Sequence, residues 1–207
     1  MKVVVSIGGS VLVPDLEADQ VSEHAAVVEG LADAGCTVGA VVGGGPTARD
    51  YVGTARDLGA NEIALDELGI ATTRLNAKLL VAALEGRAAP KVPEDYETAG
   101  EVLRREDIVV MGGVAPGQTT DAVGAALAEY VDADLLVYAT SVPGVFDADP
   151  DADPSATASY FSNSRCSVGG SSGPSFARTR PVNVAMAPAR SARGERLTRA
   201  TSDSSVS

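Results

Sequence analysis

The first 140 residues alternate short apolar runs with longer amphipathic segments. Four runs have the length and the Val, Ile and Leu content of buried strands, at residues 3–7, 37–42, 108–111 and 133–139. Apolar residues at helical spacing mark 15–34, the segment up to 58, 62–85, 94–105 and an Ala-rich run after 120. Strands that alternate with helices predict a parallel sheet covered on both faces. The expected fold is therefore α/β, a three-layer α/β/α sandwich on a mostly parallel sheet.

Three of the four predicted strands end in a pair of glycines, at residues 8–9, 43–44 and 112–113. Glycine lets a backbone approach a ligand closely, and the N–H groups of such turns and of helix N-termini bind anions. Any one of these turns alone would more often be an ordinary βα loop. Three of them at the carboxyl edge of one parallel sheet, where open α/β folds bind ligands, predict a phosphate-binding site.

Some polar residues near these turns are candidates for ligand contacts. Asp66, Gly69 and Thr73 fall on one side of the helix predicted over 62–85 and leave a polar notch there. A kinked amphipathic helix with exposed polar groups is the alternative. Arg49 follows the glycines at 43–45 and could hold a phosphate with its planar guanidinium, although a solvated surface arginine is the plain interpretation. His24, the only histidine, is expected to be structural.

Composition and charge narrow the class of protein. The sequence has no apolar run of 18 residues and no basic leader segment, so we expect a cytoplasmic protein. Cys36 and Cys166 lie far apart, which disfavours a disulfide or a zinc site. Residues 1–154 carry 26 acidic side chains against nine basic ones. Such a surface is typical of halophilic proteins and repels nucleic acids and anionic membranes, although a plain acidic face would look the same.

The last 53 residues differ from the rest of the chain. Residues 155–207 contain 13 Ser and seven Arg, but no Ile and one Leu, and carry a net charge of +5. Such a segment buries too little apolar surface to offset its ordering entropy. We therefore expect a domain over 1–154 and a disordered tail, which we interpret as a product of a shifted reading frame. A natural basic tail and a folded remnant over 181–187 are the alternatives.

The motifs together resemble the archaeal-type uridylate (UMP) kinases of the amino-acid kinase superfamily. The matching segments cover about residues 1–155, and the one at 66–77 and the Pro-Gly-x-Thr-Thr-Asp turn are the most specific. They read I-G-G-S-V-L at 7–12, V-V-G-G-G at 41–45, D-x-x-G-I-x-x-T-x-x-N-A at 66–77, V-M-G-G-V-x-P-G-x-T-T-D at 110–121, A-D-L-L-V at 133–137 and A-T-S-V-P-G-V-F-D-A-D-P at 139–150.

The resemblance implies phosphoryl transfer from MgATP to UMP, giving UDP and ADP for pyrimidine nucleotide synthesis, by a homohexamer. It implies Mg²⁺ held mainly through phosphates rather than by a protein metal site, and no nucleic-acid or membrane partner. It assigns the ATP side to Gly8, Gly9, Ser10, Gly45, Arg49, Thr140, Phe146 and Asp149. It assigns the UMP side to Gly44, Asp66, Val114, Ala115, Pro116, Gly117, Gln118, Thr119 and Thr120.

The sequence departs from the family pattern in three places. Ser6 stands where bacterial relatives usually carry Lys, although archaeal-type members also lack that Lys. Pro143 replaces the Asp of the usual T-x-V-D-G-V. Residues 155–207 match nothing of the family's C-terminal region, which completes the ATP side. Two alternatives therefore stand beside UMP kinase. One is a nucleotide-binding relative with impaired catalysis. The other is a related small-molecule kinase such as isopentenyl phosphate kinase. Those enzymes use a histidine near the phosphate acceptor, and His24 lies in the wrong segment of this chain to serve that role.

Overall fold

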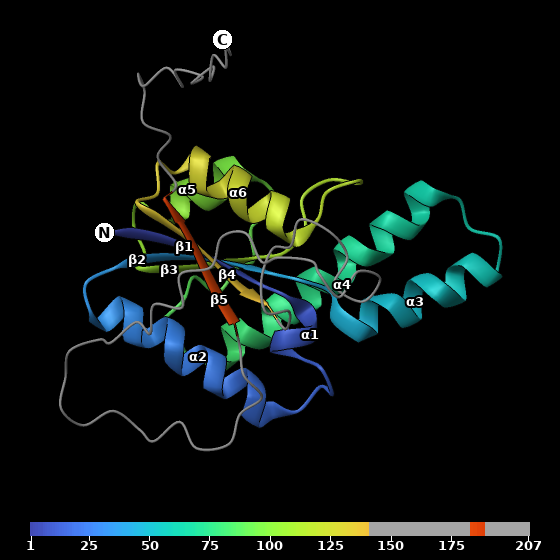
Figure 1. Cartoon of the computed structure of the whole chain (residues 1–207), viewed down its shortest axis with the longest axis horizontal. Coiled ribbons are helices and arrows are strands. Elements are labelled where there is room, and N and C mark those ends of the chain that lie inside the picture. Colours follow the sequence, from blue (N-terminus) through green and yellow to red (C-terminus); the bar gives the residue numbers. More distant parts are fainter. Residues whose placement is uncertain (141–182, 189–207) are drawn as a thin grey trace, which may run out of the picture.

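A computed structural model describes residues 1–140 and 183–188, the latter as backbone only. Its core is a five-stranded sheet in the order β3-β2-β1-β4-β5 (Figure 1). β1 pairs in parallel with both β2 and β4, β3 pairs in parallel with β2, and β5 pairs antiparallel with β4. The strands are β1 (Lys2–Ile7), β2 (Thr37–Val42), β3 (Ile108–Met111), β4 (Leu135–Thr140) and β5 (Asn183–Pro188).

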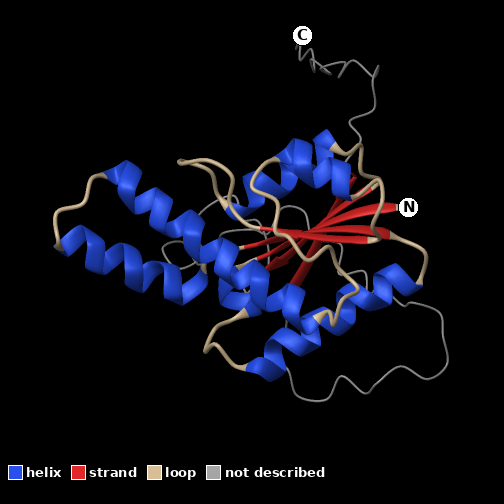
Figure 2. Cartoon of the chain, turned by 180° about the vertical axis from the view of Figure 1, so that it is seen from behind, coloured by secondary structure: helices blue, strands red, loops and turns tan. Residues whose placement is uncertain are grey.

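Helices cover both faces of this sheet (Figure 2). One face packs against α1, α2 and α4, and the other against α5 and α6. Along β1, Val3 and Val5 face the first layer while Val4 faces the second, as the pleat of a strand requires. The α/β/α sandwich expected from the sequence is confirmed. The helices are α1 (Gly9–Leu12), α2 (Ala18–Asp33), α3 (Gly45–Asp57), α4 (Glu62–Ala83), α5 (Tyr96–Val102) and α6 (Thr120–Tyr130).

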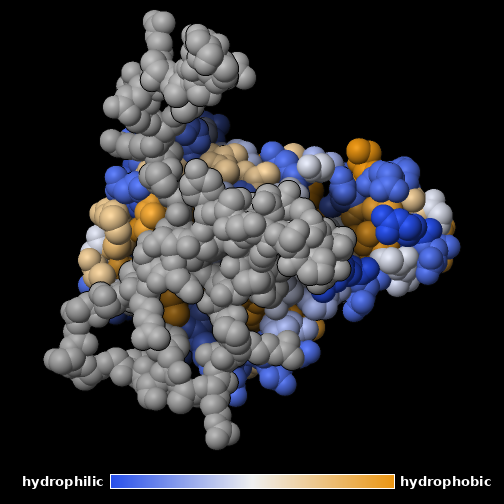
Figure 3. Space-filling view, viewed as in Figure 1, coloured by the Kyte–Doolittle hydropathy of each residue, from blue (hydrophilic) through white to orange (hydrophobic). Residues whose placement is uncertain are grey.

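The pair α3 and α4 forms a hairpin that projects beyond the end of the sheet (Figure 1). α3 packs against α4 and has no buried residue. The hairpin exposes large apolar side chains to solvent, among them Tyr51 (57% exposed) and Leu58 (83%). Figure 3 shows apolar surface on this projection among hydrophilic residues. No helix in the described part of the chain is both long and apolar enough to cross a bilayer.

The structure differs from the sequence-based expectation in the tail. The tail was expected to lack regular elements, but residues 183–188 form β5 along the outer edge of β4. An unpaired edge strand exposes backbone N–H and C=O groups, and β5 supplies partners for them. The six residues of β5 can supply these hydrogen bonds through their backbone alone. They do not need the apolar side chains that a new core layer would require. The remaining tail residues, and with them the frame-shift interpretation, lie outside the described residues.

Asp95 begins α5 and links its stability to pH. Its carboxylate accepts hydrogen bonds from the backbone N–H (2.7 Å) and the hydroxyl (2.9 Å) of Thr98. These bonds lower the pKa of Asp95 below the usual value, the backbone bond contributing most. A lowered folded-state pKa adds stability above the unfolded value of about 4, which is lost as the pH falls through the folded value.

We therefore expect Asp95→Ala to lower the midpoint of urea unfolding at pH 6. The difference from the unmodified chain should shrink as the pH is lowered below about 4, because the carboxylate becomes protonated in both states. Glu97→Ala, which removes an exposed carboxylate of the same helix, is the control. A difference between the Asp95 variant and the parent that does not change with pH would contradict this account.

Candidate functional site

The glycine turns after β1 and β2 are in direct backbone contact. A Cβ atom added to Gly9 would lie 2.6 Å from the carbonyl carbon and oxygen of Gly43. A Cβ added to Gly45 would lie 2.6 Å from the carbonyl of Gly9, and the φ of Gly45 is +64°. Only glycine fits these positions, because side chains would separate the two turns. The result is a bare backbone surface at the carboxyl ends of β1 and β2.

The order of the strands reverses beside β1. β2 and β3 lie on one side of it and β4 on the other. Open α/β sheets bind ligands at such a point, outside the carboxyl ends of the strands. The N–H of Gly8 donates to the carbonyl of Ala139 (3.1 Å), which joins the first glycine turn to the end of β4. Of the residues assigned to ATP from the sequence, Gly8, Gly9, Ser10 and Thr140 are thus brought to this edge.

The other residues assigned to ATP are distributed differently. Arg49 lies in the second turn of α3 and is exposed. Gly45 begins α3 and lines the cavity described next, so it lies between the two sides. Phe146 and Asp149 lie outside the described residues.

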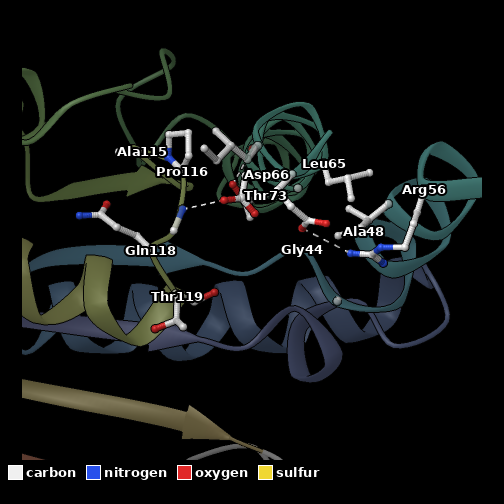
Figure 4. A pocket seen from close by; sticks show the side chains of 17 residues that line it. Gly44, Ala48, Arg56, Leu65, Asp66, Thr73, Ala115, Pro116, Gln118 and Thr119 are labelled. Atoms are coloured by element: carbon white, nitrogen blue, oxygen red, sulfur yellow. Dashed lines mark hydrogen bonds and ion pairs between the residues drawn. The ribbon is translucent and has the colours of Figure 1, made fainter. Parts of the chain in front are cut away.

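A cavity of about 530 Å³ opens at the carboxyl ends of β2 and β3, and we call it the β2–β3 cavity. The α3–α4 hairpin forms one wall and the loop between β3 and α6, residues 112–119, forms the other (Figure 4). Nearly all the residues assigned to UMP line it, namely Gly44, Asp66, Ala115, Pro116, Gly117, Gln118, Thr119 and Thr120. Val114 is the exception, because its side chain packs against the core under α5 and α6.

Asp66 points from α4 toward the β3–α6 loop (Figure 4). Its Oδ2 accepts a hydrogen bond from the N–H of Gly117 (2.8 Å), a residue with a φ of +78°. At the end of the same loop, the hydroxyl of Thr119 caps α6 by accepting from the N–H of Ala122 (3.1 Å). One carboxylate oxygen of Asp66 therefore positions the loop while the carboxyl group as a whole lines the cavity.

Three α4 residues that the resemblance assigned to neither substrate also support the two turns of the site, and one of them, Thr73, lines the cavity. The Nδ2 of Asn76 donates to the carbonyls of Gly43 (2.9 Å) and Gly44 (3.0 Å), and the side chain is 2% exposed. Thr73 and Arg74 bond to the backbone of Gly113. The sequence signal for Asn76 was an Asn in the middle of a predicted helix. Asn is a poor helix former, so an Asn at such a position indicates that its side-chain amide has hydrogen-bond partners.

The charged groups that line the cavity are Asp66, Glu62 and Arg56. Arg56 is the one cationic side chain among the described residues that line it, and it was not predicted. It lies 3.8 Å from the Glu62 carboxylate, and both side chains are largely exposed. Such a pair contributes little to stability. Arg56 is therefore free to reorient toward an anionic ligand at little cost.

A second unpredicted charged group, the carboxylate of Asp121, lies at the carboxyl end of β1. Asp121, in the first turn of α6, accepts a hydrogen bond from the hydroxyl of Ser6 (2.8 Å), which is 1% exposed. Burial raises the pKa of Tyr138 on β4, and the charge of Asp121 raises it further. The motif at 110–121 contains Asp121, but no spacing in the sequence connects it with Ser6. These polar groups lie beside the carboxyl ends of β1 and β4.

Comparisons with known proteins agree with this geometry. The sequence profile of the amino acid kinase family matches residues 1–160. A uridylate kinase from Halobacterium salinarum is 71% identical over 161 residues, 78% of this chain and 66% of the relative. A uridylate kinase from Haloquadratum walsbyi is 71% identical over 150 residues, 72% of this chain and 62% of the relative. The chain thus spans slightly less than two thirds of these relatives.

Solved structures show the same fold. The crystal structure of a uridylate kinase from Archaeoglobus fulgidus superposes with a TM-score of 0.70 at 50% identity, over 76% of this chain and 72% of that one. A UMP kinase from Bacillus anthracis, at 24% identity, superposes with a TM-score of 0.62 and shows the fold alone. The family profile extends over more than half of the sequence, and the glycine turns and the cavity lie within it. The chain therefore belongs to the amino acid kinase family.

Proposed function

We propose that this chain transfers the terminal phosphoryl group of ATP to UMP, giving ADP and UDP for pyrimidine nucleotide synthesis. The observation that carries the proposal is the β2–β3 cavity. Its volume of about 530 Å³ lies in the range of small-molecule sites. It offers a carboxylate, Asp66, two threonine hydroxyls and the backbone of two glycine turns. This mixture suits a sugar with free hydroxyls that is joined to a phosphate.

In this proposal UMP lies in the β2–β3 cavity with its phosphate toward Gly44, Thr119 and Thr120. Backbone N–H groups and hydroxyls bind phosphate oxygens without needing a positive side chain. Asp66 would accept hydrogen bonds from the ribose hydroxyls through the oxygen that does not hold Gly117. The uracil would contact the backbone of the β3–α6 loop over Val114 to Gln118.

ATP would bind along the adjacent edge, with its phosphates on Gly8, Gly9, Ser10 and Gly45. The turns suit such a group because glycines at 9 and 45 let the two backbones touch and leave no side chain between them and the phosphates. Thr140, Phe146 and Asp149 would line the adenosine pocket. Mg²⁺ bound to the ATP phosphates would neutralise the charge that develops during transfer.

The proposed chemistry needs positioning more than reactive side chains. The two turns touch, so a donor phosphate on one and an acceptor phosphate on the other would lie side by side. Holding both in line supplies much of the rate enhancement, and N–H groups directed at the transferred oxygens stabilise its charge. No covalent intermediate is required.

We also propose that the enzyme works in the cytoplasm as a homohexamer. The apolar side chains exposed on the α3–α4 hairpin support self-association, since exposed apolar surface of this kind marks protein interfaces. Sedimentation velocity of the purified chain tests the assembly, and a single monomeric species at micromolar concentration would contradict it.

The test of the function is ADP release from MgATP with different acceptors. UMP should be phosphorylated well ahead of CMP and AMP, because the β3–α6 loop would contact the base. It should also be preferred over isopentenyl phosphate, which has no ribose for Asp66 to bind. Equal turnover of CMP and UMP would contradict the assignment. ATP binding measured by calorimetry without ADP release would instead favour a nucleotide-binding protein with impaired catalysis.

Arg49 provides a separate test of the donor side. We expect Arg49→Ala to lower kcat/KM for ATP about tenfold, the loss typical of a hydrogen bond to a charged group. Arg49→Lys should restore little activity, because a point charge cannot replace a planar guanidinium. Arg104→Ala, at an exposed position just after α5, is the matched control for loss of one positive charge. A fully active Lys variant would show that Arg49 is a solvated surface residue that does not bind the phosphates.

A further inference from the structure

We propose that Thr73 and Arg74 are positioning residues that hold the β3–α6 loop in the shape that receives the acceptor nucleotide. The family resemblance assigns neither residue to a substrate, although Thr73 is one of the candidate ligand contacts and lines the β2–β3 cavity. Each acts on the loop through a single residue, Gly113. The identity of the ligand rests on the proposed function, whereas the effect on the loop does not.

Two consecutive side chains of α4 bind both backbone groups of Gly113. The hydroxyl oxygen of Thr73 accepts from the Gly113 N–H (2.7 Å) while donating to the carbonyl of Ile70 (2.6 Å). The Nε of Arg74 donates to the Gly113 carbonyl (3.2 Å). The guanidinium continues to Glu94, whose carboxylate lies 2.7 Å from it. The peptide groups on either side of Gly113 are therefore fixed in orientation at the point where the loop leaves β3.

Close packing at the neighbouring residue supports this arrangement. A Cβ added to Gly112 would lie 2.5 Å from the Thr73 hydroxyl and 2.8 Å from the Arg74 nitrogen. α4 thus lies directly against the backbone at the end of β3. The hydroxyl of Thr73 has a specific use at this contact, because its donor and acceptor functions are both occupied.

The loop is held at two more points farther along. Asp66, two helical turns before Thr73, accepts from Gly117 (2.8 Å). The hydroxyl of Tyr96 on α5 donates to the side-chain oxygen of Gln118 (3.2 Å). Six consecutive residues of the cavity wall, 115–120, follow Gly113 in the chain. An error in the direction of the chain at Gly113 would displace all of them, and a preorganised loop loses less entropy on binding.

The neighbouring residue Thr72 makes a matched control possible. Its hydroxyl donates to the carbonyl of Leu68 (2.8 Å), also within α4, and it is 3% exposed, but it does not line the cavity. Thr72→Val and Thr73→Val therefore each remove one hydroxyl that bonds inside the same helix. Only the second also removes an acceptor for the loop. Thr73→Ser keeps that acceptor.

The experiment compares these variants and Arg74→Lys in the full 207-residue chain. We expect Thr73→Val to raise the KM for UMP about tenfold, as for a donor left without its partner, with the KM for ATP changed less than twofold. Arg74→Lys should also raise the KM for UMP. The planar guanidinium reaches the Gly113 carbonyl and the Glu94 carboxylate at once, and an ammonium group cannot do both. Thr73→Ser and Thr72→Val should resemble the parent chain.

Hydrogen exchange provides a readout that does not depend on the proposed reaction. The Gly113 and Gly117 amides should exchange faster in Thr73→Val and not in Thr73→Ser or Thr72→Val. Unchanged exchange and unchanged KM for UMP in Thr73→Val and Arg74→Lys would overturn the inference, as would equal rises in the KM values for UMP and ATP. If the parent chain phosphorylated no UMP, the proposed function would be wrong. Faster exchange in the β3–α6 loop of Thr73→Val alone would still support the positioning role.

Discussion

Replacing Gly9 with alanine is expected to destabilise the fold by about 3 kcal/mol or more, the upper range for overpacking. The new methyl group would lie 2.6 Å from the carbonyl of Gly43 and in collision with the nitrogen of Gly45. Both contacts are with backbone at the ends of two central strands, so neither side can move without breaking sheet pairing. Urea unfolding followed by circular dichroism measures the loss.

Gly8→Ala is the control for this prediction. A Cβ at Gly8 would meet nothing closer than 3.6 Å, and its φ of −56° suits any residue. The unfolding free energy should therefore change by less than about 1 kcal/mol, because both conformational and packing costs are absent. Similar losses for Gly8→Ala and Gly9→Ala would show that the contact between the turns is not what makes Gly9 necessary.

The second large effect is expected for Asp66→Ala on UMP binding. The substitution removes the proposed ribose acceptor and leaves the Gly117 N–H without its carboxylate. Losing a hydrogen bond to a charged group costs about 1–3 kcal/mol, and the loop would also lose its anchor at Gly117, so the Kd for UMP should rise about tenfold or more. Isothermal titration with UMP measures it, with ATP as the reference ligand.

Two further variants make this prediction specific. Glu67→Ala removes the adjacent carboxylate, which is exposed and outside the cavity, and should leave the Kd for UMP unchanged. Asp66→Asn keeps one acceptor oxygen and should fall between the Ala variant and the parent. If Glu67→Ala weakened UMP binding as much as Asp66→Ala, the effect would come from net charge and not from the position of Asp66.

Much of the sheet could be predicted because its strands are buried on both faces. Such strands read as unbroken apolar runs, and the residues 38 and 40–42 in β2 are in fact fully buried. The glycine pairs marked the strand ends because the turns after β1 and β2 lie too close together for side chains. The short helix α1 was not predicted, because four residues carry no measurable period.

The supporting contacts of the site could not be predicted from spacing. The helix pattern placed Asp66 and Thr73 on one side of α4, and that side does face the cavity. Whether Arg74 reaches Gly113, 39 residues away, depends on how α4 crosses the end of β3, which no local pattern encodes. The bond between Ser6 and Asp121 spans 115 residues and has the same origin. β5 was only an alternative to the expected disordered tail, because its pairing depends on the free edge of β4 and not on its own composition.

The antiparallel pairing of β5 with β4 also has a consequence for the order of events during synthesis. The end of β5 follows the end of β4 by 48 residues. At ribosomal rates of about 5–20 residues per second, the nascent chain carries β4 for roughly 2–10 s before its partner strand is complete. The first three strands can pair meanwhile, because they precede β4 in the chain. Until β5 is complete, the outer edge of β4 is an unpaired strand edge that other nascent chains can reach.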